Sequence, residues 1–243
     1  MRIWPCFAIA VAVAVPAQAD ITGTYRSVHA GIEMTMRVQV AANGDLRADM
    51  NRPEIYIIKH SGHAYFVMQM PEGPVVADVQ DAAAVMQEEM KKLDPAFCSQ
   101  VKEAAPSFVL TDRGEMTVAG RKGEAYASAQ RTGSMPDVVI SHDPELAPLG
   151  AALAAQFRLS TTLMGGVMGE CMAEIPMFRQ MQELLDSGTA LMFGGMQLET
   201  VETGPIDPAR FVLPAPPAPR EKVRQIMMHK DAGTPGNGPR PAN

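Results

Sequence analysis

The chain of 243 residues has few aromatic side chains, only 5% of its residues, and it lacks the common catalytic signatures. It contains no GxSxG nucleophile turn, no HExxH zinc motif, no GxxxxGK[ST] phosphate loop and no GxGxxG dinucleotide turn. These absences exclude the enzyme classes that are read from such motifs. We therefore expect a protein that is not an enzyme and that holds no cofactor and no metal.

Long apolar runs are also missing. The longest run near the N-terminus, residues 7–15, follows Arg2 and is far shorter than the roughly 20 residues that cross a bilayer as a helix. Ala17-Gln18-Ala19 then provides a small-x-small cleavage site before Asp20. This pattern is typical of a secretory signal peptide, residues 1–19, cleaved after Ala19. It predicts a periplasmic protein with no transmembrane segment in the mature chain.

Cysteine is scarce, since only Cys98 and Cys171 follow the predicted cleavage site. Two cysteines in an oxidising compartment favour a disulfide over a metal pair. Such a bond would close a loop of about 74 residues and stabilise the fold by roughly 4 kcal/mol in the chain-entropy model.

Charge is unevenly distributed in a chain whose net charge is −6. We expect one domain over residues 20–213 and a disordered, proline-rich tail over residues 214–243, in which five basic side chains outnumber two acidic ones. The acidic body argues against nucleic acid as a partner. The basic tail is open to three interpretations: contact with an anionic membrane surface, contact with a protein partner, or solvated disorder.

Strict apolar–polar alternation predicts two strands within residues 32–50. If partners share a face, Val40 lies opposite Leu46 and Met36 lies opposite Met50, which demands a three-residue loop, Ala42-Asn43-Gly44. A second hairpin is predicted around Ser61-Gly62, with Ile57 opposite Phe66, Ile55 opposite Met68 and Tyr56 opposite Val67. Further strands are predicted at 21–29, 107–111, 115–119, 123–129, 135–141, 189–193 and 196–203.

Helices are predicted in two blocks. Asp78 can cap a helix that extends to Leu93, and Asp94-Pro95 begins a short second one. Asp143-Pro144 opens the second block, which Gly165-Gly166 weakens, and Pro176 begins a helix that ends at Gly188. Together these elements predict an α+β fold in which a large, curved, mostly antiparallel sheet packs against several helices.

Methionine is unusually abundant, with 19 residues in the chain. Three interpretations remain open: ordinary core packing, an adaptable apolar cavity, and a Cu(I) site that uses soft thioether ligands. The cavity hypothesis places a ligand on a sheet face lined by Met34, Met36, Val38, Met50, Phe66 and Met68. His60 and His63 should face each other across the second turn, but no third donor completes a metal site.

Several short segments carry a resemblance: Gly-Arg-Lys-Gly-Glu-Ala-Tyr at 120–126, Gly188-Thr-Ala-Leu191, and Ile206-Asp-Pro-Ala-Arg-Phe-Val-Leu-Pro214. With these and the signal peptide, the chain resembles an uncharacterised family of exported bacterial proteins related in fold to the lipoprotein carriers LolA and LolB. The resemblance covers roughly residues 21–214. It implies a half-barrel sheet wrapped over a few helices around an apolar cavity, which receives acyl chains in the carriers. Many members have a cysteine where this chain has Gly123 or Glu124, so the disulfide pattern differs and lipoprotein transport does not carry over.

These observations predict a non-enzymatic periplasmic protein that binds an apolar ligand, either an acyl chain of a lipid or a hydrophobic peptide, in a Met-rich cavity between sheet and helices. The alternatives are a periplasmic Cu(I)-binding protein and a structural or interaction protein recognised through its tail.

Overall fold

The structure is a computed structural model that describes residues 19–29, 31–50, 55–93, 108–129, 135–168 and 175–228. The predicted signal peptide up to residue 18, the cysteines Cys98 and Cys171, and the predicted short helix after Asp94 lie outside the described residues. None of the helices described is both long enough and apolar enough to pass through a membrane.

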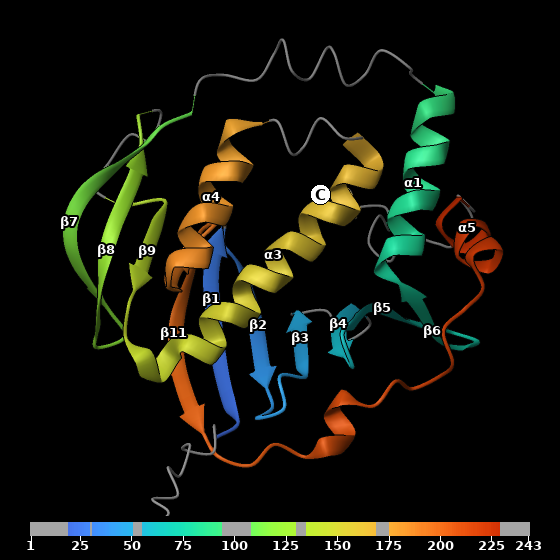
Figure 1. Cartoon of the computed structure of the whole chain (residues 1–243), viewed down its shortest axis with the longest axis horizontal. Helices are drawn as coiled ribbons and strands as arrows, with labels where there is room; N and C mark the ends of the chain where they lie inside the picture. Colours follow the sequence, from blue (N-terminus) through green and yellow to red (C-terminus); the bar gives the residue numbers. More distant parts are fainter. Residues whose placement is uncertain are drawn as a thin grey trace, which may run out of the picture.

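Within the described residues, eleven strands form one open antiparallel sheet in the order β6-β5-β4-β3-β2-β1-β11-β10-β9-β8-β7 (Figure 1). Four α-helices accompany it, so the prediction of an α+β fold with a large antiparallel sheet is confirmed. The strands are β1 (Ile21–His29), β2 (Ile32–Val40), β3 (Leu46–Met50), β4 (Ile55–His60), β5 (His63–Met70), β6 (Gly73–Asp78), β7 (Leu110–Val118), β8 (Arg121–Ser128), β9 (Val138–Ser141), β10 (Thr189–Phe193) and β11 (Met196–Thr203).

Both predicted hairpins have the predicted register. Val40 pairs with Leu46 and Met36 pairs with Met50 around a loop in which Gly44 has a φ of 86°. In the second hairpin, the three predicted pairs across β4 and β5 form as expected. Local alternation and turn chemistry were sufficient here because each hairpin closes over a short loop.

Three strand predictions need correction. β7 is one strand and not two, because the Asp112-Arg113-Gly114 stretch is a bulge inside it and not a turn. Gly114 takes a φ of 86° there, and its N–H donates to Asp112 Oδ1 at 2.7 Å. β6 was not predicted at all, because Pro74 argues against a strand, yet this proline sits opposite Gln69 at the edge of the sheet. The predicted 135–141 strand begins only at Val138.

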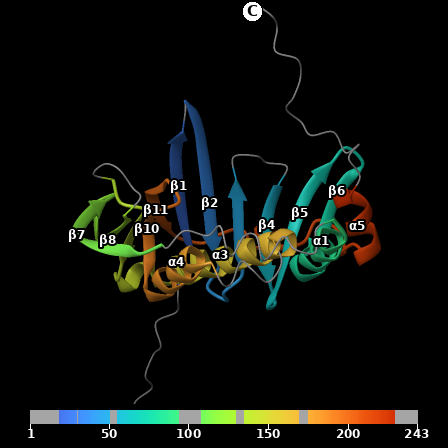
Figure 2. The same cartoon turned by 90° about the horizontal axis from the view of Figure 1, so that it is seen from above.

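The helices cover one face of the sheet (Figures 1 and 2). They are α1 (Val79–Leu93), α3 (Ala147–Met168), α4 (Pro176–Ser187) and α5 (Arg220–Met228), with 3-10 turns at Pro144–Leu146 and Pro208–Phe211. Asp78 caps α1 as predicted, since its Oδ1 accepts the N–H of Gln80 at 2.8 Å. α4 begins at Pro176 and is followed by Gly188 as predicted. The predicted weak point at Gly165-Gly166 does not interrupt α3, which continues to Met168.

The core lies between α3 and the central strands. Leu149 and Leu153 of α3 are fully buried, together with Tyr25 of β1 and Val38 of β2. The Tyr25 hydroxyl donates to the carbonyl of Ala190 at 2.9 Å, and burial raises the pKa of this tyrosine. β1 approaches α3 so closely that a Cβ at Gly23 would lie 2.6 Å from Cδ2 of Leu149. The sheet and the helix are therefore packed tightly at this point.

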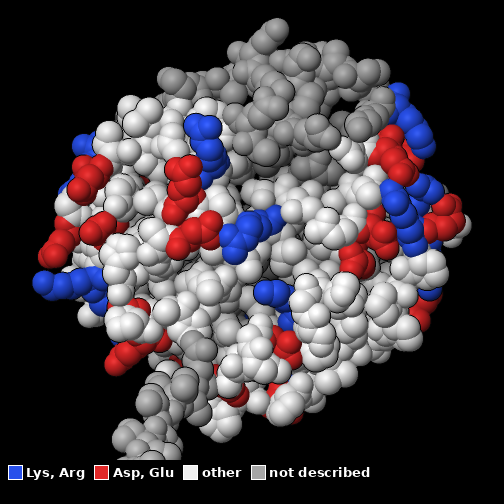
Figure 3. Space-filling model, in the orientation of Figure 1, with Lys and Arg blue, Asp and Glu red and all other residues white. Residues whose placement is uncertain are grey.

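The tail was predicted to be disordered over residues 214–243, but residues 214–228 are packed against the domain. Ala218 donates its N–H to the carbonyl of Val76 at 2.8 Å, which places this segment along the edge strand β6. Val223 of α5 is fully buried, and Arg220 and Arg224 both pair with Glu88 of α1. Figure 3 shows acidic and basic side chains intermixed at this edge of the molecule. Composition suggested a solvated basic tail, but Arg220 and Arg224 of this tail form ion pairs with Glu88 of α1.

The sheet bends strongly at its β7 end. β7 comes close to β11 although β8, β9 and β10 lie between them in the sheet order. As a result of this bend, the β7–β8 turn lies near β11 and β1. This bend forms one wall of the groove described below.

Candidate functional site

The β1–β2 hairpin extends past its neighbours as a two-stranded ribbon (Figure 2). Pairing between β1 and β11 ends at Arg26 and Gln197, whereas pairing between β1 and β2 continues to His29 and Ile32. On the other side, pairing between β2 and β3 ends at Met36. Within the described residues, the tip of this ribbon therefore has no strand partner on either outer edge.

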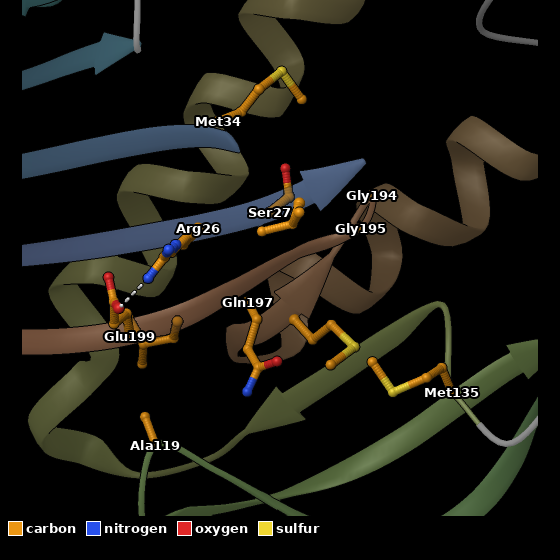
Figure 4. Close-up of a pocket in the computed structure, with 12 residues that line it drawn as sticks. Arg26, Ser27, Met34, Ala119, Met135, Gly194, Gly195, Gln197 and Glu199 are labelled. Carbon is orange, nitrogen blue, oxygen red and sulfur yellow. Dashed lines mark hydrogen bonds and ion pairs between the residues drawn. The ribbon is translucent and has the colours of Figure 1, made fainter. Parts of the chain in front are cut away.

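A groove of about 880 Å³ lies at the base of the ribbon (Figure 4). Its walls come from β1, β2, the β10–β11 hairpin, the β7–β8 turn and the segment before β9. The lining residues are Arg26, Ser27, Val28, Met34, Ala119, Met135, Met192, Gly194, Gly195, Gln197, Leu198 and Glu199.

The groove passes around the Gly194-Gly195 turn. Both glycines have positive φ values, 56° and 80°, as a two-residue hairpin turn requires. Direct pairing places Arg26 and Gln197 on one face of the sheet, and Ser27 shares the opposite face with its partner Met34. Because β10 and β11 end at this turn while the ribbon continues, side chains from both faces reach the same groove.

The apolar lining consists mainly of methionine. Met34 and Met135 are about half exposed, at 48% and 50%, and Met192 is buried at the base. Val28 adds an exposed branched side chain, at 66%. Thioether side chains are unbranched and polarizable, so they adapt to apolar ligands of different shapes.

The polar side of the groove is an ion-pair network around Arg26. Its guanidinium contacts Glu33 Oε2 at 2.8 Å and Glu199 Oε1 at 3.3 Å. The hydrogen bond to Glu33, followed by that to Glu199, raises the pKa of Arg26. The Arg26 guanidinium thus faces two carboxylates. In Figure 4, Arg26 and Glu199 lie on the side opposite Met135.

Two neutral polar groups lie between these sides. The Ser27 side chain is buried, at 9% exposure, and its Oγ has no hydrogen-bond partner. Gln197 is exposed on β11, the strand next to β1. Buried hydroxyl groups in folded proteins are nearly always hydrogen-bonded, so Ser27 is an exception.

The six residues predicted to line a ligand cavity do not come together. Only Met34 reaches the groove. Met36 and Val38 are core residues, at 2% and 0% exposure, and Sδ of Met36 accepts a hydrogen bond from Gln156 of α3 at 3.3 Å. These two residues therefore lie in the core and not along the groove, and Gln156 of α3 packs directly onto Met36.

The other three predicted residues are spread over three strands. Met50 is 51% exposed at the end of β3. Phe66 packs against the main core cluster, and Met68 is half-buried opposite Ile55 and Val75. The groove is instead lined by Met135, Met192, Val28 and Ser27, which are not among the six residues predicted to line a cavity. A glycine pair between two predicted strands was the one local signal, and it marks a turn but not a groove.

The histidine pair has the predicted geometry. His60 pairs with His63 across the turn of β4 and β5, and each faces a carboxylate of its own, Asp45 at 2.8 Å and Asp78 at 3.9 Å. Among the described residues, no three histidine, cysteine or acidic side chains are grouped so that they could hold a metal ion.

A smaller hollow of about 410 Å³ lies between β8 and α4. Its Tyr126 hydroxyl donates to Glu124 Oε2 at 2.7 Å, and this hydrogen bond, with desolvation, raises the pKa of Tyr126 to about 12. His142 Nε2 lies 3.7 Å from the same carboxylate oxygen. A tyrosine held protonated in this way is a poor base near neutral pH, so we place the candidate site at the larger groove.

No protein-family model, curated protein or solved structure gives a significant match to the chain. The function of the groove is therefore argued from its own geometry.

Proposed function

We propose that the chain is an exported, non-enzymatic binding protein that takes an apolar ligand, an acyl chain of a lipid or a hydrophobic peptide, in the groove at the base of the β1–β2 ribbon. The observation that carries the proposal is the gathering of Met34, Met135 and Met192 from three separate elements around one groove of about 880 Å³. This volume is within the range of protein sites for small molecules, and such sites are mostly apolar with a few polar groups.

The resemblance to the lipoprotein carriers supports the same class of ligand. It implies a curved, half-barrel antiparallel sheet wrapped over a few helices, and a large antiparallel sheet with its helices on one face is present here. The expected cavity between sheet and helices is replaced in this proposal by a groove at the end of the strands, because α3 packs closely on Gly23 and Met36. The predicted signal peptide supports a periplasmic location for this activity.

Uptake of Nile red, an uncharged apolar dye, tests the proposal. The purified protein should bind the dye, and Met135→Glu should weaken binding by about 10-fold or more, because the new carboxylate would have to be desolvated against the ligand. Met164→Glu is the matched control, since Met164 is similarly exposed, at 44%, but lies on α3 outside the groove. A protein that takes up no dye, or equal losses in both variants, would refute the proposal.

The same three thioethers support a second candidate, a Cu(I) site, because soft sulfur ligands favour this ion. Titration with Cu(I) against a competing chelator separates the two. Binding that is lost in a Met34→Leu variant with dye uptake retained would favour copper, because leucine keeps the apolar volume and removes the sulfur.

A further inference from the structure

The groove holds an unpaired polar group that an apolar chain alone would not satisfy. Ser27 is nine-tenths buried, and its Oγ lacks a hydrogen-bond partner in the structure. Its neighbours on β1, Arg26 and Val28, line the same groove, as does its cross-strand partner Met34. Rotation of this small side chain about χ1 is the minimal change that would present the hydroxyl to a ligand.

The charged groups of the groove are already paired with one another. The Arg26 guanidinium is shared between Glu33 and Glu199, so an incoming carboxylate would have to compete with both for it. The two carboxylates also repel an anionic head group placed beside them. A cationic head group would have to compete with Arg26 for the same two carboxylates.

The polar side chains of the groove that lie outside this ion-pair network are neutral. These are the Ser27 hydroxyl, on the same face as Met34, and the exposed side-chain amide of Gln197, on the opposite face (Figure 4). Both groups donate and accept hydrogen bonds. We infer that the ligand is an uncharged single-chain amphiphile whose ester, amide or hydroxyl head group hydrogen-bonds to Ser27 after rotation of that side chain, while its chain lies against Met34, Met135 and Met192. This inference rests on the proposed function and names the ligand class of the same groove.

Competition with Nile red compares three amphiphiles with the same chain: monooleoylglycerol, oleate and oleylamine. Monooleoylglycerol should displace the dye at a concentration about 5-fold or more below that of either charged compound. Ser27→Ala should weaken monooleoylglycerol binding by about 5- to 10-fold, the usual effect of one hydrogen bond. Ser27→Thr keeps the hydroxyl and should retain most of the binding.

The outcomes separate the two levels of the hypothesis. If wild-type protein takes up no Nile red, the groove itself is refuted and the inference falls with it. If the dye binds but oleate or oleylamine competes as well as monooleoylglycerol, only the head-group inference is refuted. Unchanged monooleoylglycerol affinity in Ser27→Ala would also refute it, and a urea-denaturation curve like that of wild type verifies that the variant is folded.

Discussion

The close approach of β1 to α3 gives a sharp test of whether the interface between sheet and helices is solid. A methyl group added at Gly23 would lie 2.6 Å from Cδ2 and 2.9 Å from Cδ1 of Leu149. Leu149 is fully buried, so its side chain has little room to move away. A hollow interface would accept the methyl group easily, whereas a packed one would not.

The magnitude follows from two opposing effects of Gly23→Ala. Overpacking in a core costs about 1–3 kcal/mol, and replacing glycine lowers the entropy of the unfolded chain by an amount that stabilises the fold by about 0.4–1 kcal/mol. The single variant should therefore be destabilised by at most about 2.6 kcal/mol. Leu149→Ala alone should cost about 2–5 kcal/mol through the cavity that it leaves.

A double-mutant cycle measured by urea denaturation removes the entropy effect, because that contribution is the same in both backgrounds. In Leu149→Ala the new methyl at position 23 has space, so the double variant should be more stable than the sum of the single changes predicts by about 1–3 kcal/mol. A control cycle combines Gly23→Ala with Val223→Ala on α5, and these changes should be additive. Additivity within about 0.5 kcal/mol at Gly23 and Leu149 would refute the tight packing deduced here.

Three further predictions concern other parts of the molecule. Val223→Ala should destabilise the protein by about 1.5–3 kcal/mol in urea, because a fully buried side chain loses two carbons, whereas Lys222→Ala, at the exposed neighbour, should change stability by less than about 0.5 kcal/mol. Tyr126 should ionise near pH 12 in an absorbance titration, and Glu124→Gln should lower its pKa. Since the folded-state pKa is raised above the ordinary 10, the stability that this tyrosine contributes should be complete below pH 10 and disappear as the pH rises through about 12. Asp49→Ala should cost about 1–3 kcal/mol in thermal or urea unfolding, because this carboxylate accepts hydrogen bonds from two arginines, one of which belongs to the Pro208–Phe211 turn. A stability equal to that of wild type would contradict the first and third of these predictions, and a Tyr126 pKa near 10 would contradict the second.

The sequence was most informative where a strand and its partner are joined by a short turn. The alternation of β2 and β3 and the position of Gly44 were enough to predict the full register of that hairpin. The same reasoning failed at Asp112-Arg113-Gly114, where a bulge and a turn use the same residues. Only the pairing with the neighbouring strand distinguishes a bulge from a turn, because the residues before and after a bulge belong to one strand and pair with the same partner.

The groove could not be predicted from sequence patterns within single segments, because it depends on the order of the strands in the sheet. Met135 precedes β9, whereas Met34 belongs to β2, and they line one groove because β1, β11 and β10 lie between β2 and β9 in a sheet that bends. No periodicity within either segment encodes that order. The packed part of the tail was missed for a similar reason, since its proline content was visible but the matching Glu88 on α1 became a neighbour only in three dimensions.

Met34 and Met36 show why the pattern of methionines could not by itself distinguish core from binding surface. They lie two residues apart on β2 and therefore share a face, yet Met36 is 2% exposed and Met34 is 48% exposed. Gln156 of α3 contacts Met36, whereas Met34 lies on the ribbon, beyond the last described pair of β2 and β3. Whether a methionine of β2 is buried or exposed thus depends on where the helix layer and the neighbouring strands end. An alternating strand that extends beyond both the helix layer and the neighbouring strands exposes apolar side chains that would otherwise be buried in the core. On β2, Met34 exposes an adaptable thioether in this way, and it lies with the unpaired Ser27 hydroxyl beside the groove.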